Sequence, residues 1–591
     1  MVLRPQTGEV KSMIERESTC TLRVYPFQER VTFTPGESVS EILHRAGLGL
    51  DSPCGGQGVC GQCLIVVHDP GHVPQTPHEA LSEQDMEQGY RLACQLRPQT
   101  DLTITILESG RSDHRSEGAA LSEPDKYVSS GDIAPAARVG RTADSLIYTY
   151  EGIQDSFTCF EHTDCSGLYG LALDLGTTTL AASLVCLESG AQLGTLSALN
   201  PQVQFGQDVL TRIKHAGDLK GRQELMDCIR EGINALARDV CAKAKALPTE
   251  IVDIVVGGNT TMLQICAGID PSPLGQLPFR VDLKGGRSYP AQEFGLTAHA
   301  FARVYIPPIA HAFVGTDVSA GLGAACDFFT PGAAHLYIDV GTNGEMGLSM
   351  GGMQMLTSTA AGPAFEGAGL TCGMRAAEGA VERVDFHGED IAVQTIADVP
   401  EPLGICGSGF IDLMHVLVDI GVIDPSGRMK KPEEGDDLPD TVAKRLVLRD
   451  GKPAFSLAEG VVFTQGDVRK LQLAKAAIRA GMECLLHEAG VSAADLDKIS
   501  IAGGFGRFLR PPSLQAIGMV PPDTAAKIEF VGNTSRLGCI RLLLDCSRRE
   551  RLETDMASVK YLAIAEQPAF MDRFVECIPF PQPDAAKALR N

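Results

Sequence analysis

Residues 171–179 read LALDLGTTT, and residues 336–345 read LYIDVGTNGE. In each stretch an apolar run ends in an aspartate, and a Gly-Thr turn follows. Such runs predict buried strands, and small residues at a strand end leave backbone N–H groups accessible to phosphate oxygens. A single D-x-G-T is weak evidence, because an ordinary strand and turn has the same composition. Two copies in one chain indicate a repeated strand-and-turn unit that binds a nucleotide.

The residues of these turns are the candidate nucleotide site. The leading aspartates, Asp174 and Asp339, can hold Mg²⁺ through water, because Mg²⁺ keeps much of its hydration. The chain has no G-x4-G-K-[ST] motif, which excludes a P-loop enzyme. A third glycine-rich turn follows an apolar strand predicted at 498–501. The candidate ATP-binding residues are Gly176, Thr177, Thr178 and Thr179 in the first turn, Gly341, Thr342, Asn343 and Gly344 in the second, and Gly503, Gly504 and Phe505 in the third.

Four cysteines near the N-terminus form a second candidate site. Cys54, Cys60 and Cys63 have the spacing C-x5-C-x2-C, and Cys94 follows. This pattern is typical of a [2Fe–2S] ferredoxin, with a first gap one residue longer than the plant-type spacing. A zinc site or four unrelated buried thiols are the alternatives, but zinc prefers paired C-x2-C units. The four cysteines are therefore the predicted cluster ligands.

The elements expected around the cysteines suit a β-grasp ferredoxin domain over residues 18–110. Residues 111–167 are rich in small and charged residues and are expected to be a linker, with some order around 145–153. Strands and helices alternate over residues 168–591, which indicates an α/β domain. The elements predicted in the N-terminal domain are a hairpin at 20–33, a helix at 38–47, a strand at 64–67, a helix at 81–88 and a strand at 102–107.

Composition and charge argue against several classes of protein. The formal net charge of −23 argues against a general nucleic-acid binder and against an anionic membrane surface. Neither a signal peptide nor an apolar run of membrane-spanning length is evident. Eighteen cysteines in a long chain without an export signal favour a reducing cytoplasm. The expected location is therefore cytoplasmic.

The order of motifs resembles the actin-like (ribonuclease H-like) ATPase superfamily. The resemblance implies a duplicated ATPase domain of two subdomains over 168–591, with an adenosine loop at 502–506. It also implies a first connecting helix at 314–321 and a second connecting helix that begins at 464. Asp317 matches the acidic residue that orients the attacking water, although a helix-capping role explains an aspartate there equally well. Glu345 is a second candidate for the metal or the water. The proposed catalytic carboxylates are Asp174, Asp317, Asp339 and Glu345.

Longer segments are similar to the reductive activators of corrinoid proteins. This resemblance implies that a [2Fe–2S] cluster returns oxidised cob(II)amide to cob(I)amide on a methyl-transferring corrinoid protein, driven by ATP hydrolysis. Members of the family carry a further folded domain between ferredoxin and ATPase, for which only about residues 110–167 are available here. The segments are NPQVQFGQDVLTRI (200–213), GGNTTMLQICAGIDPSPLG (257–275), IPPIAHAFVGTD (306–317), AAGPAFEGAG (360–369), GICGSGFIDL (404–413) and TQGDVRKLQLAKAAIRAG (464–481).

The expected partners are a corrinoid protein and a low-potential electron donor, and a homodimer is left open. The alternative function is ATP-dependent activation of another low-potential metalloenzyme. A ferredoxin-linked sensor and a small-molecule kinase are further alternatives. The ferredoxin would have no evident task in a kinase.

Overall fold

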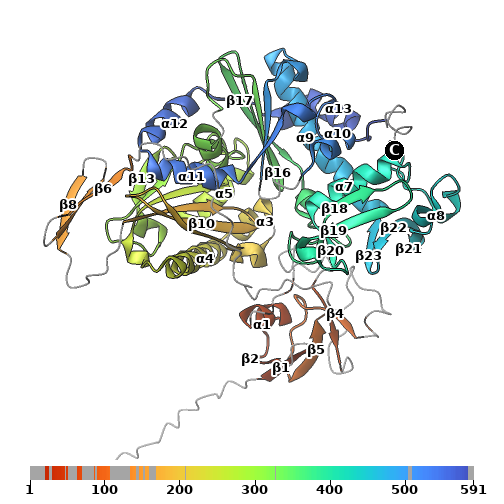
Figure 1. Cartoon of the computed structure of the whole chain (residues 1–591). Helices are drawn as coiled ribbons and strands as arrows, with labels where there is room; N and C mark the ends of the chain where they lie inside the picture. Colours follow the sequence, from red (N-terminus) through yellow and green to blue (C-terminus); the bar gives the residue numbers. More distant parts are fainter. Residues whose placement is uncertain are drawn as a thin grey trace, which may run out of the picture. The chain divides into compact units, whose positions relative to one another are not determined.

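The computed structural model describes residues 20–25, 29–46, 48, 50, 63–68, 86, 89–106, 134–141, 145–150, 153–158, 168–206, 208–325, 328–503 and 509–582. The chain divides into two compact units. One unit holds residues 1–120 and 198–221, and the other holds residues 121–197 and 222–591. Figure 1 labels the helices and strands of both.

The N-terminal part of the first unit is a five-stranded mixed sheet with the order β2-β1-β5-β3-β4. Strands β1 and β2 form the predicted hairpin, with Leu22 opposite Val31. Alternate side chains, such as Leu22, Val24 and Ile104, are buried, which is the pattern of a sheet covered on one face. The strands are β1 (Cys20–Tyr25), β2 (Glu29–Phe33), β3 (Leu64–Val67), β4 (Tyr90–Leu92) and β5 (Leu102–Ile106).

Helix α1 (Val39–Arg45) packs on this sheet through Ile42 and Leu43. It begins at Ser38, as predicted, because Ser38 Oγ accepts from the backbone N–H of Glu41 and the Glu41 carboxylate accepts from the backbone N–H of Ser38. The β-grasp ferredoxin prediction is confirmed for the described residues. The helix predicted at 81–88 lies outside them, apart from Met86. The other segment of this unit carries α3 (Val209–His215).

The segment expected to be a linker contains a small antiparallel sheet in the order β6-β7-β8. Its strands are β6 (Ala137–Arg141), β7 (Ser145–Tyr150) and β8 (Ile153–Thr158). The apolar and β-branched residues of SLIYTYEGI are the signal in the sequence for the middle strand.

The first six-stranded sheet of the second unit has the order β11-β10-β9-β12-β14-β13. Strand β9 pairs antiparallel with β10 and parallel with β12. All eight residues of β12 are buried, as its apolar sequence predicts. The elements are β9 (Tyr169–Leu175), β10 (Thr179–Cys186), β11 (Gln192–Leu199), α4 (Leu219–Ala244), β12 (Ile251–Gly258), α5 (Thr260–Cys266), β13 (Arg287–Pro290), β14 (Arg303–Ile306) and α6 (Thr316–Ala320).

The second six-stranded sheet has the order β25-β24-β15-β16-β17-β26. Its main elements are β15 (His335–Val340), β16 (Asn343–Met350), β17 (Met353–Ala360), α9 (Gln465–Ala489), β24 (Lys498–Ala502), β25 (Ile528–Gly532), α11 (Thr534–Leu544), α12 (Ser547–Ala557), β26 (Lys560–Tyr561) and α13 (Pro568–Glu576). Between β17 and α9 the chain adds two three-stranded sheets. The first contains β18 (Ala380–Phe386), β19 (Ile391–Thr395) and β20 (Gly404–Ile405), and the second contains β21 (Leu446–Arg449), β22 (Lys452–Ala458) and β23 (Val461–Thr464). The remaining helices are α7 (Gly407–Asp419), α8 (Asp440–Ala443) and α10 (Pro511–Ala516).

The two large sheets repeat one strand order, which confirms the duplicated actin-like fold. The strands β11-β10-β9-β12-β14 correspond to β17-β16-β15-β24-β25. By this correspondence α6 follows β14 as α11 follows β25, so α11 is the second connecting helix. The expectation that this helix begins at 464 is wrong, because α9 precedes β24 as α4 precedes β12.

Helix α11 crosses from the second half of the repeat to the first. It packs against β9, β12 and α6, and Figure 1 shows it in blue beside the first half. At the crossing with α6, a Cβ on Gly538 would lie 2.2 Å from the carbonyl oxygen of Ala320. Glycine therefore permits the close approach of the two connecting helices.

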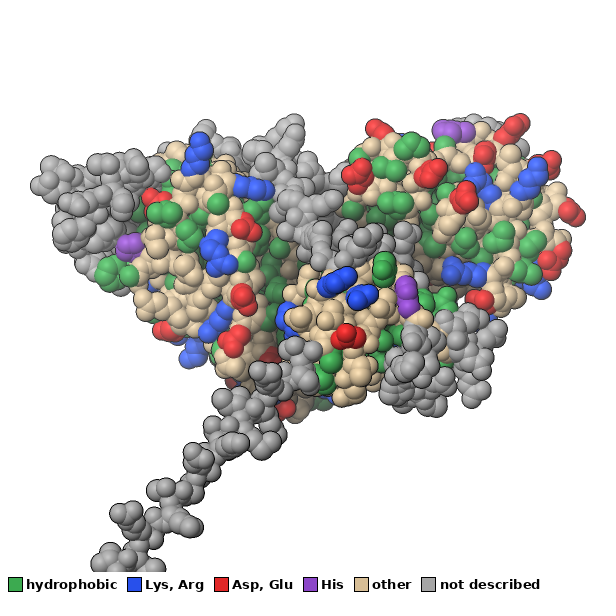
Figure 2. Space-filling model, turned by 90° about the horizontal axis from the view of Figure 1, so that it is seen from below, with side chains coloured by type: hydrophobic (Ala, Val, Ile, Leu, Met, Phe, Trp, Pro, Cys, Tyr) green, Lys and Arg blue, Asp and Glu red, His purple; other side chains and the backbone are tan. Residues whose placement is uncertain are grey.

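The charge on the surface and the length of the helices both bear on what this protein can contact. On the face shown in Figure 2, Lys and Arg side chains of the described residues lie among Asp and Glu side chains rather than in one broad basic patch. Of the helices in the described parts of the chain, none combines the length and the apolar character needed to cross a bilayer.

Candidate functional site

Asp174 lies at the end of β9, beside Gly257 of the parallel strand β12. A Cβ at Gly257 would lie 2.3 Å from Ser535 Oγ, so glycine makes room for that hydroxyl. Ser535 Oγ donates to Asp174 Oδ1 at 2.8 Å, and Asn533 Nδ2 donates to Asp174 Oδ2 at 2.6 Å. Side chains from the start of α11 thus hold both carboxylate oxygens of Asp174.

Asp339 occupies the matching place in the second sheet, at the end of β15. It is opposite Glu345 in the β15–β16 pair, and Tyr337 OH donates to Asp339 Oδ2 at 3.3 Å. Gly503, which follows the neighbouring strand β24, has a φ of +121°, and a Cβ there would lie 2.6 Å from the carbonyl oxygen of Val340. The start of the third glycine-rich turn therefore lies against the second of the two Gly-Thr turns (176–179 and 341–344), which are called the first and second phosphate turns below because the sequence predicts that they bind phosphate.

Asp317 is the second residue of α6 and does not cap it. The N-cap is Gly315, and a Cβ on Gly315 would lie 2.3 Å from the carbonyl oxygen of Gly258. The Asp317 carboxylate accepts a hydrogen bond from the backbone N–H of Val318 at 2.9 Å. Asp317 is therefore not the N-cap residue of α6, although its carboxylate accepts an N–H of the first turn.

Burial and mutual repulsion raise the pKa of the carboxyl groups. Burial first, then Asp339 and Asp174, raise the pKa of Asp317 to about 7. Burial and the charge of Asp174 raise the pKa of Asp339 to about 6. Burial, with Asp317 and Asp339, holds the pKa of Glu345 well above its usual range. The four predicted carboxylates therefore interact in one site.

This site suits a hydrated divalent cation. A cation among these carboxylates would favour their ionised forms and offset their repulsion. Among the residues that the structure describes, no group of three or more His, Cys, Asp or Glu is arranged to chelate a metal ion directly. Mg²⁺ usually keeps several waters and takes only one or two carboxylates. The donor set thus fits a magnesium ion held through water by Asp174 and Asp339.

The first phosphate turn closes on itself. Gly176 N donates to the carbonyl oxygen of Thr179 at 3.0 Å, and a Cβ on Gly176 would lie 2.6 Å from that oxygen. Thr177 Oγ1 accepts from Asn259 Nδ2 at 3.0 Å, and Asn259 also caps α5. Thr178 is partly buried and Thr179 is exposed. The turn is therefore fixed at both ends while its last hydroxyls remain accessible.

The second phosphate turn is joined to the glycine-rich loop that follows β17. Gly341 N donates to the carbonyl oxygen of Asn343 at 2.9 Å, and Thr342 Oγ1 donates to Glu366 Oε1 at 2.7 Å. Asn343 and Gly344 begin β16. The predicted residues of this turn are thus together, and Glu366 is an additional carboxylate beside them.

The third turn is only partly visible. Gly504 and Phe505 lie outside the described residues. Arg510, just beyond them, donates through Nε to Asp412 Oδ1 at 2.9 Å and through Nη1 to Asp385 Oδ1 at 2.6 Å. Because Asp412 belongs to α7 and Asp385 to β18, Arg510 anchors the chain after the predicted adenosine loop to the added sheets.

The predicted cluster ligands are partly described. Cys54 and Cys60 lie outside the described residues, whereas Cys63 and Cys94 are buried with their Sγ atoms 3.2 Å apart. The pairing of β3 with β4 and the bond from Ala93 N to the carbonyl oxygen of Cys63 bring these cysteines together. Hydrogen bonding with Cys94 is the main effect that lowers the pKa of Cys63 to about 6.

This spacing fits metal coordination. Two thiolates about 2.3 Å from one tetrahedral metal ion lie about 3.8 Å apart, and the two sulfurs, at 3.2 Å, need to separate only slightly to share one metal ion. Cys20, which is outside the cysteine pattern, instead donates to the carbonyl oxygen of Gln99 at 3.6 Å.

Asn533, Ser535 and Tyr337 contact the site but were not predicted from the sequence. A signal for the first two exists, because VGNTSRLG (531–538) matches VGTDVSAG (314–321) in its valine and its two glycines. The match can be recognised only when the order of strands in the two sheets is known, because the alignment pairs Asp317 of one segment with Thr534 of the other.

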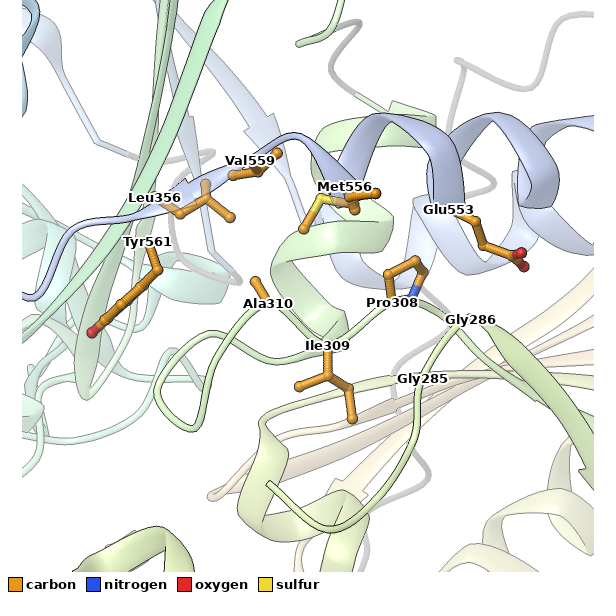
Figure 3. Close-up of a pocket in the computed structure, with 11 residues that line it drawn as sticks. Gly285, Gly286, Pro308, Ile309, Ala310, Leu356, Glu553, Met556, Val559 and Tyr561 are labelled. Carbon is orange, nitrogen blue, oxygen red and sulfur yellow. The ribbon is translucent and has the colours of Figure 1, made fainter. Parts of the chain in front are cut away.

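A separate cavity of about 340 Å³ lies where α12 leads into β26. Figure 3 shows Pro308, Ile309, Leu356, Met556 and Tyr561 around it, with the Glu553 carboxylate pointing away. None of the four site carboxylates lines this cavity.

Three family models match successive parts of the chain. Residues 23–99 match the 2Fe-2S iron-sulfur cluster binding domain, residues 169–328 the RACo middle region, and residues 333–589 the C-terminal domain of RACo, the ASKHA domain. The expectation that only residues 110–167 remain for the middle domain is wrong, because the model of that region matches the first six-stranded half.

Two curated relatives and one solved structure extend the match. The chain is 30% identical to the corrinoid activation enzyme RamQ of Eubacterium limosum, over 93% of this chain and 97% of that protein. It is 27% identical to the [Co(II) methylated amine-specific corrinoid protein] reductase of Methanosarcina barkeri, over 64% of this chain and 71% of that protein. The structure of a reductive activator for corrinoid, iron-sulfur protein aligns with a TM-score of 0.69 and 28% identity, over 96% of this chain and 99% of that one. The chain belongs to the family of reductive activators of corrinoid proteins.

Proposed function

We propose that this chain uses ATP to pass one electron from a [2Fe–2S] cluster to the cob(II)amide of a corrinoid protein, which returns it to cob(I)amide in a methyltransferase system. The observation that carries the proposal is the presence, in one chain, of a paired-thiol site and a shared carboxylate site beside two phosphate turns. The names of the relatives support a corrinoid protein as the acceptor.

The ferredoxin residues would supply the electron-transfer site. A bound [2Fe–2S] cluster supplies one electron at low potential. Cys54, Cys60, Cys63 and Cys94 would hold it, and the pairing of β3 with β4 sets the last two side by side in advance. Cobalt gains one electron and passes from Co(II) to Co(I). A separate low-potential donor must then restore that electron to this chain.

The actin-like residues would hydrolyse ATP. N–H groups and threonine hydroxyls of the two turns would hold the phosphates, and Asp174 and Asp339 would hold Mg²⁺ through water. During hydrolysis a bond forms from the water oxygen to the γ-phosphorus, and the bond from that phosphorus to ADP breaks. Asp317 lies among these carboxylates and would be ionised once the cation is bound, so it suits a group that orients the water and accepts its proton. Glu345 faces the same carboxylates from β16.

The two activities have a physical reason to be joined. Cob(I)amide is a very strong reductant, so an ordinary ferredoxin reduces cob(II)amide only weakly. Nucleotide that binds between the two halves of a duplicated fold can change which conformation of the activator and its partner is populated. Hydrolysis then returns the starting conformation.

Anaerobic absorbance spectroscopy tests the proposal. Cluster-loaded protein, a chemical reductant and a cob(II)amide-loaded corrinoid protein are mixed with and without Mg·ATP. We expect cob(I)amide to appear only with Mg·ATP, and Cys60→Ala to abolish it. Cys20→Ala is the matched control, because Cys20 is in the same domain but outside the cysteine pattern, and it should keep the activity.

Two outcomes would contradict the proposal. Cobalt reduction at the same rate without ATP would separate the ATPase from the electron step. ATP hydrolysis without reduction of cobalt in any corrinoid protein tried would favour another low-potential metalloenzyme as the target.

A further inference from the structure

Three consecutive residues at the start of α11 reach Asp174 directly and Asp339 through Tyr337. Asn533 and Ser535 donate to the two carboxylate oxygens of Asp174 at 2.6 and 2.8 Å. Thr534 Oγ1 lies 2.7 Å from the hydroxyl of Tyr337, which in turn donates to Asp339 Oδ2 at 3.3 Å. One short segment thus connects, directly or through one side chain, to both residues proposed to hold the cation.

The segment is held rigidly to the first half of the repeat. Arg536, the next residue, is 7% exposed and donates through Nη1 to Ser183 Oγ at 2.9 Å on β10. Thr534 and Ser535 are 1% and 5% exposed. Tyr337 is completely buried and lies on β15 of the second half. The contact between Thr534 and Tyr337 is therefore the point at which α11, docked on one half, reaches the other.

Helix capping explains only part of this arrangement. Asn533 Oδ1 accepts from the backbone N–H of Arg536 at 2.8 Å, which is an ordinary N-cap. The amide nitrogen of the same side chain makes the bond to Asp174, and capping does not need that bond. The two tasks of Asn533 can thus be separated by substitution, because serine also caps a helix but has no amide donor.

The matching helix of the first half has different chemistry. Helix α6 begins at Gly315 with no side-chain cap and presents Asp317 to the site. Helix α11 presents only an amide and two hydroxyls at the equivalent positions. The duplicated frame therefore supplies an acid from one connecting helix and hydrogen-bond donors from the other.

We propose that Asn533, Thr534 and Ser535 are positioning residues for ATP hydrolysis, which fix Asp174 directly and Asp339 through Tyr337 when the two halves are closed. This inference rests on the proposed ATPase function. The triplet contacts Asp174 and Tyr337 rather than the residues of the Gly-Thr turns, so its loss should misplace the cation site without removing the groups that bind the phosphates.

Steady-state ATPase kinetics on the full chain test the inference. Asn533→Ser keeps the cap and removes the donor to Asp174, and Thr534→Val removes the hydroxyl that meets Tyr337. We expect kcat to fall about tenfold or more in Asn533→Ser, which loses a hydrogen bond to a charged group, and several-fold in Thr534→Val, which loses a bond between two neutral hydroxyls. KM for ATP should change less than about threefold in both. The Mg²⁺ concentration for half-maximal activity should rise. Thr534→Ser restores the hydroxyl and should restore kcat.

The controls distinguish a failure of the positioning role from a failure of the proposed ATPase function on which it rests. The melting temperature and the visible spectrum of the cluster report whether each variant is folded. If the unaltered chain does not hydrolyse ATP, the proposed function fails. If it does hydrolyse ATP, either of two results would show that the positioning role is wrong. One is that Asn533→Ser and Thr534→Val match the unaltered chain in kcat and in Mg²⁺ dependence. The other is that Thr534→Ser is as impaired as Thr534→Val.

Discussion

Replacing Asp317 with asparagine should make the metal-free protein more stable near pH 8 while abolishing ATP hydrolysis. The reason lies in the shared carboxylate site, where burial and the charges of Asp339 and Asp174 raise the pKa of Asp317 to about 7. Asparagine has nearly the same shape but carries no charge. The substitution therefore removes a destabilising ionisation together with the group proposed to orient water.

The size of the effect follows from the shift in pKa. An unfolded aspartate titrates near about 4, and a folded-state pKa of about 7 for the half-buried Asp317 corresponds to a destabilisation on the order of 2–4 kcal/mol when the group is ionised. The folded state binds more protons than the unfolded state between these two pKa values. This contribution to stability is therefore complete below about pH 4 and is lost as the pH rises through about 7.

Thermal unfolding in EDTA at pH 5 and pH 8 measures this contribution. We expect Asp317→Asn to raise the melting temperature by a few degrees at pH 8 and much less at pH 5, since about 1 kcal/mol shifts the midpoint of a large domain by about 2–4 °C. Added Mg²⁺ should stabilise the unaltered chain more than the variant. Asp282→Asn is the matched control, because Asp282 pairs with Arg280 at the surface and its removal should change stability little.

A lower melting temperature for Asp317→Asn than for the unaltered chain at pH 8 would refute this reasoning. So would an equal gain at pH 5 and pH 8, because a gain independent of pH cannot come from removal of an ionisable group. Full ATPase activity in the variant would separately exclude the role proposed for Asp317.

Three further substitutions test other parts of the molecule. Cys60→Ala should remove the visible absorbance of the cluster and leave ATP hydrolysis intact, and a correctly folded variant without ATPase activity would mean that the two units are coupled more tightly than we propose. Asp339→Ala should do the reverse, with the cluster spectrum retained and phosphate release lost; undiminished release would remove Asp339 from the metal site. Arg549→Met should lower the free energy of unfolding by about 3–5 kcal/mol, because it removes the guanidinium that lies 2.6 Å from the fully buried Asp253 carboxylate. Chemical denaturation should show that adding Asp253→Leu recovers most of this loss, and a double variant no more stable than Arg549→Met would contradict the explanation.

Local patterns in the sequence were sufficient to predict most of the elements that form the site. The apolar run before Asp174 and the one before Asp339 became β9 and β15, because continuous apolar residues suit strands buried on both faces. Ser38 marked the start of α1 because its hydroxyl and Glu41 form a capping box. In each case the deciding interactions lie within a few residues of one another.

Contacts between distant residues could not be predicted in the same way. Asn533 meets Asp174 across 359 positions of sequence, and no local pattern specifies that partner. The place of α11 as second connecting helix likewise depends on the order of β24 and β25 in the sheet. Asp317 could not be separated from a capping residue until the structure identified Gly315 as the N-cap.

The difference between the two connecting helices has a consequence for how a duplicated fold performs one reaction. A strict repeat would place an acid at position 534, where the side chain now contacts Tyr337, whose hydroxyl donates to Asp339. The site already raises the pKa of Asp317 to about 7 and of Asp339 to about 6 through burial and like charge. A further buried carboxylate would raise these values again and favour protonation at the positions where a cation must bind. With threonine at 534, the second connecting helix keeps the position that the repeat gives it. Through Asn533 and Ser535 it brings hydrogen-bond donors to Asp174 instead of a further negative charge. One half of the repeat then supplies the acid proposed to orient the water, while the other fixes the aspartates proposed to hold the cation.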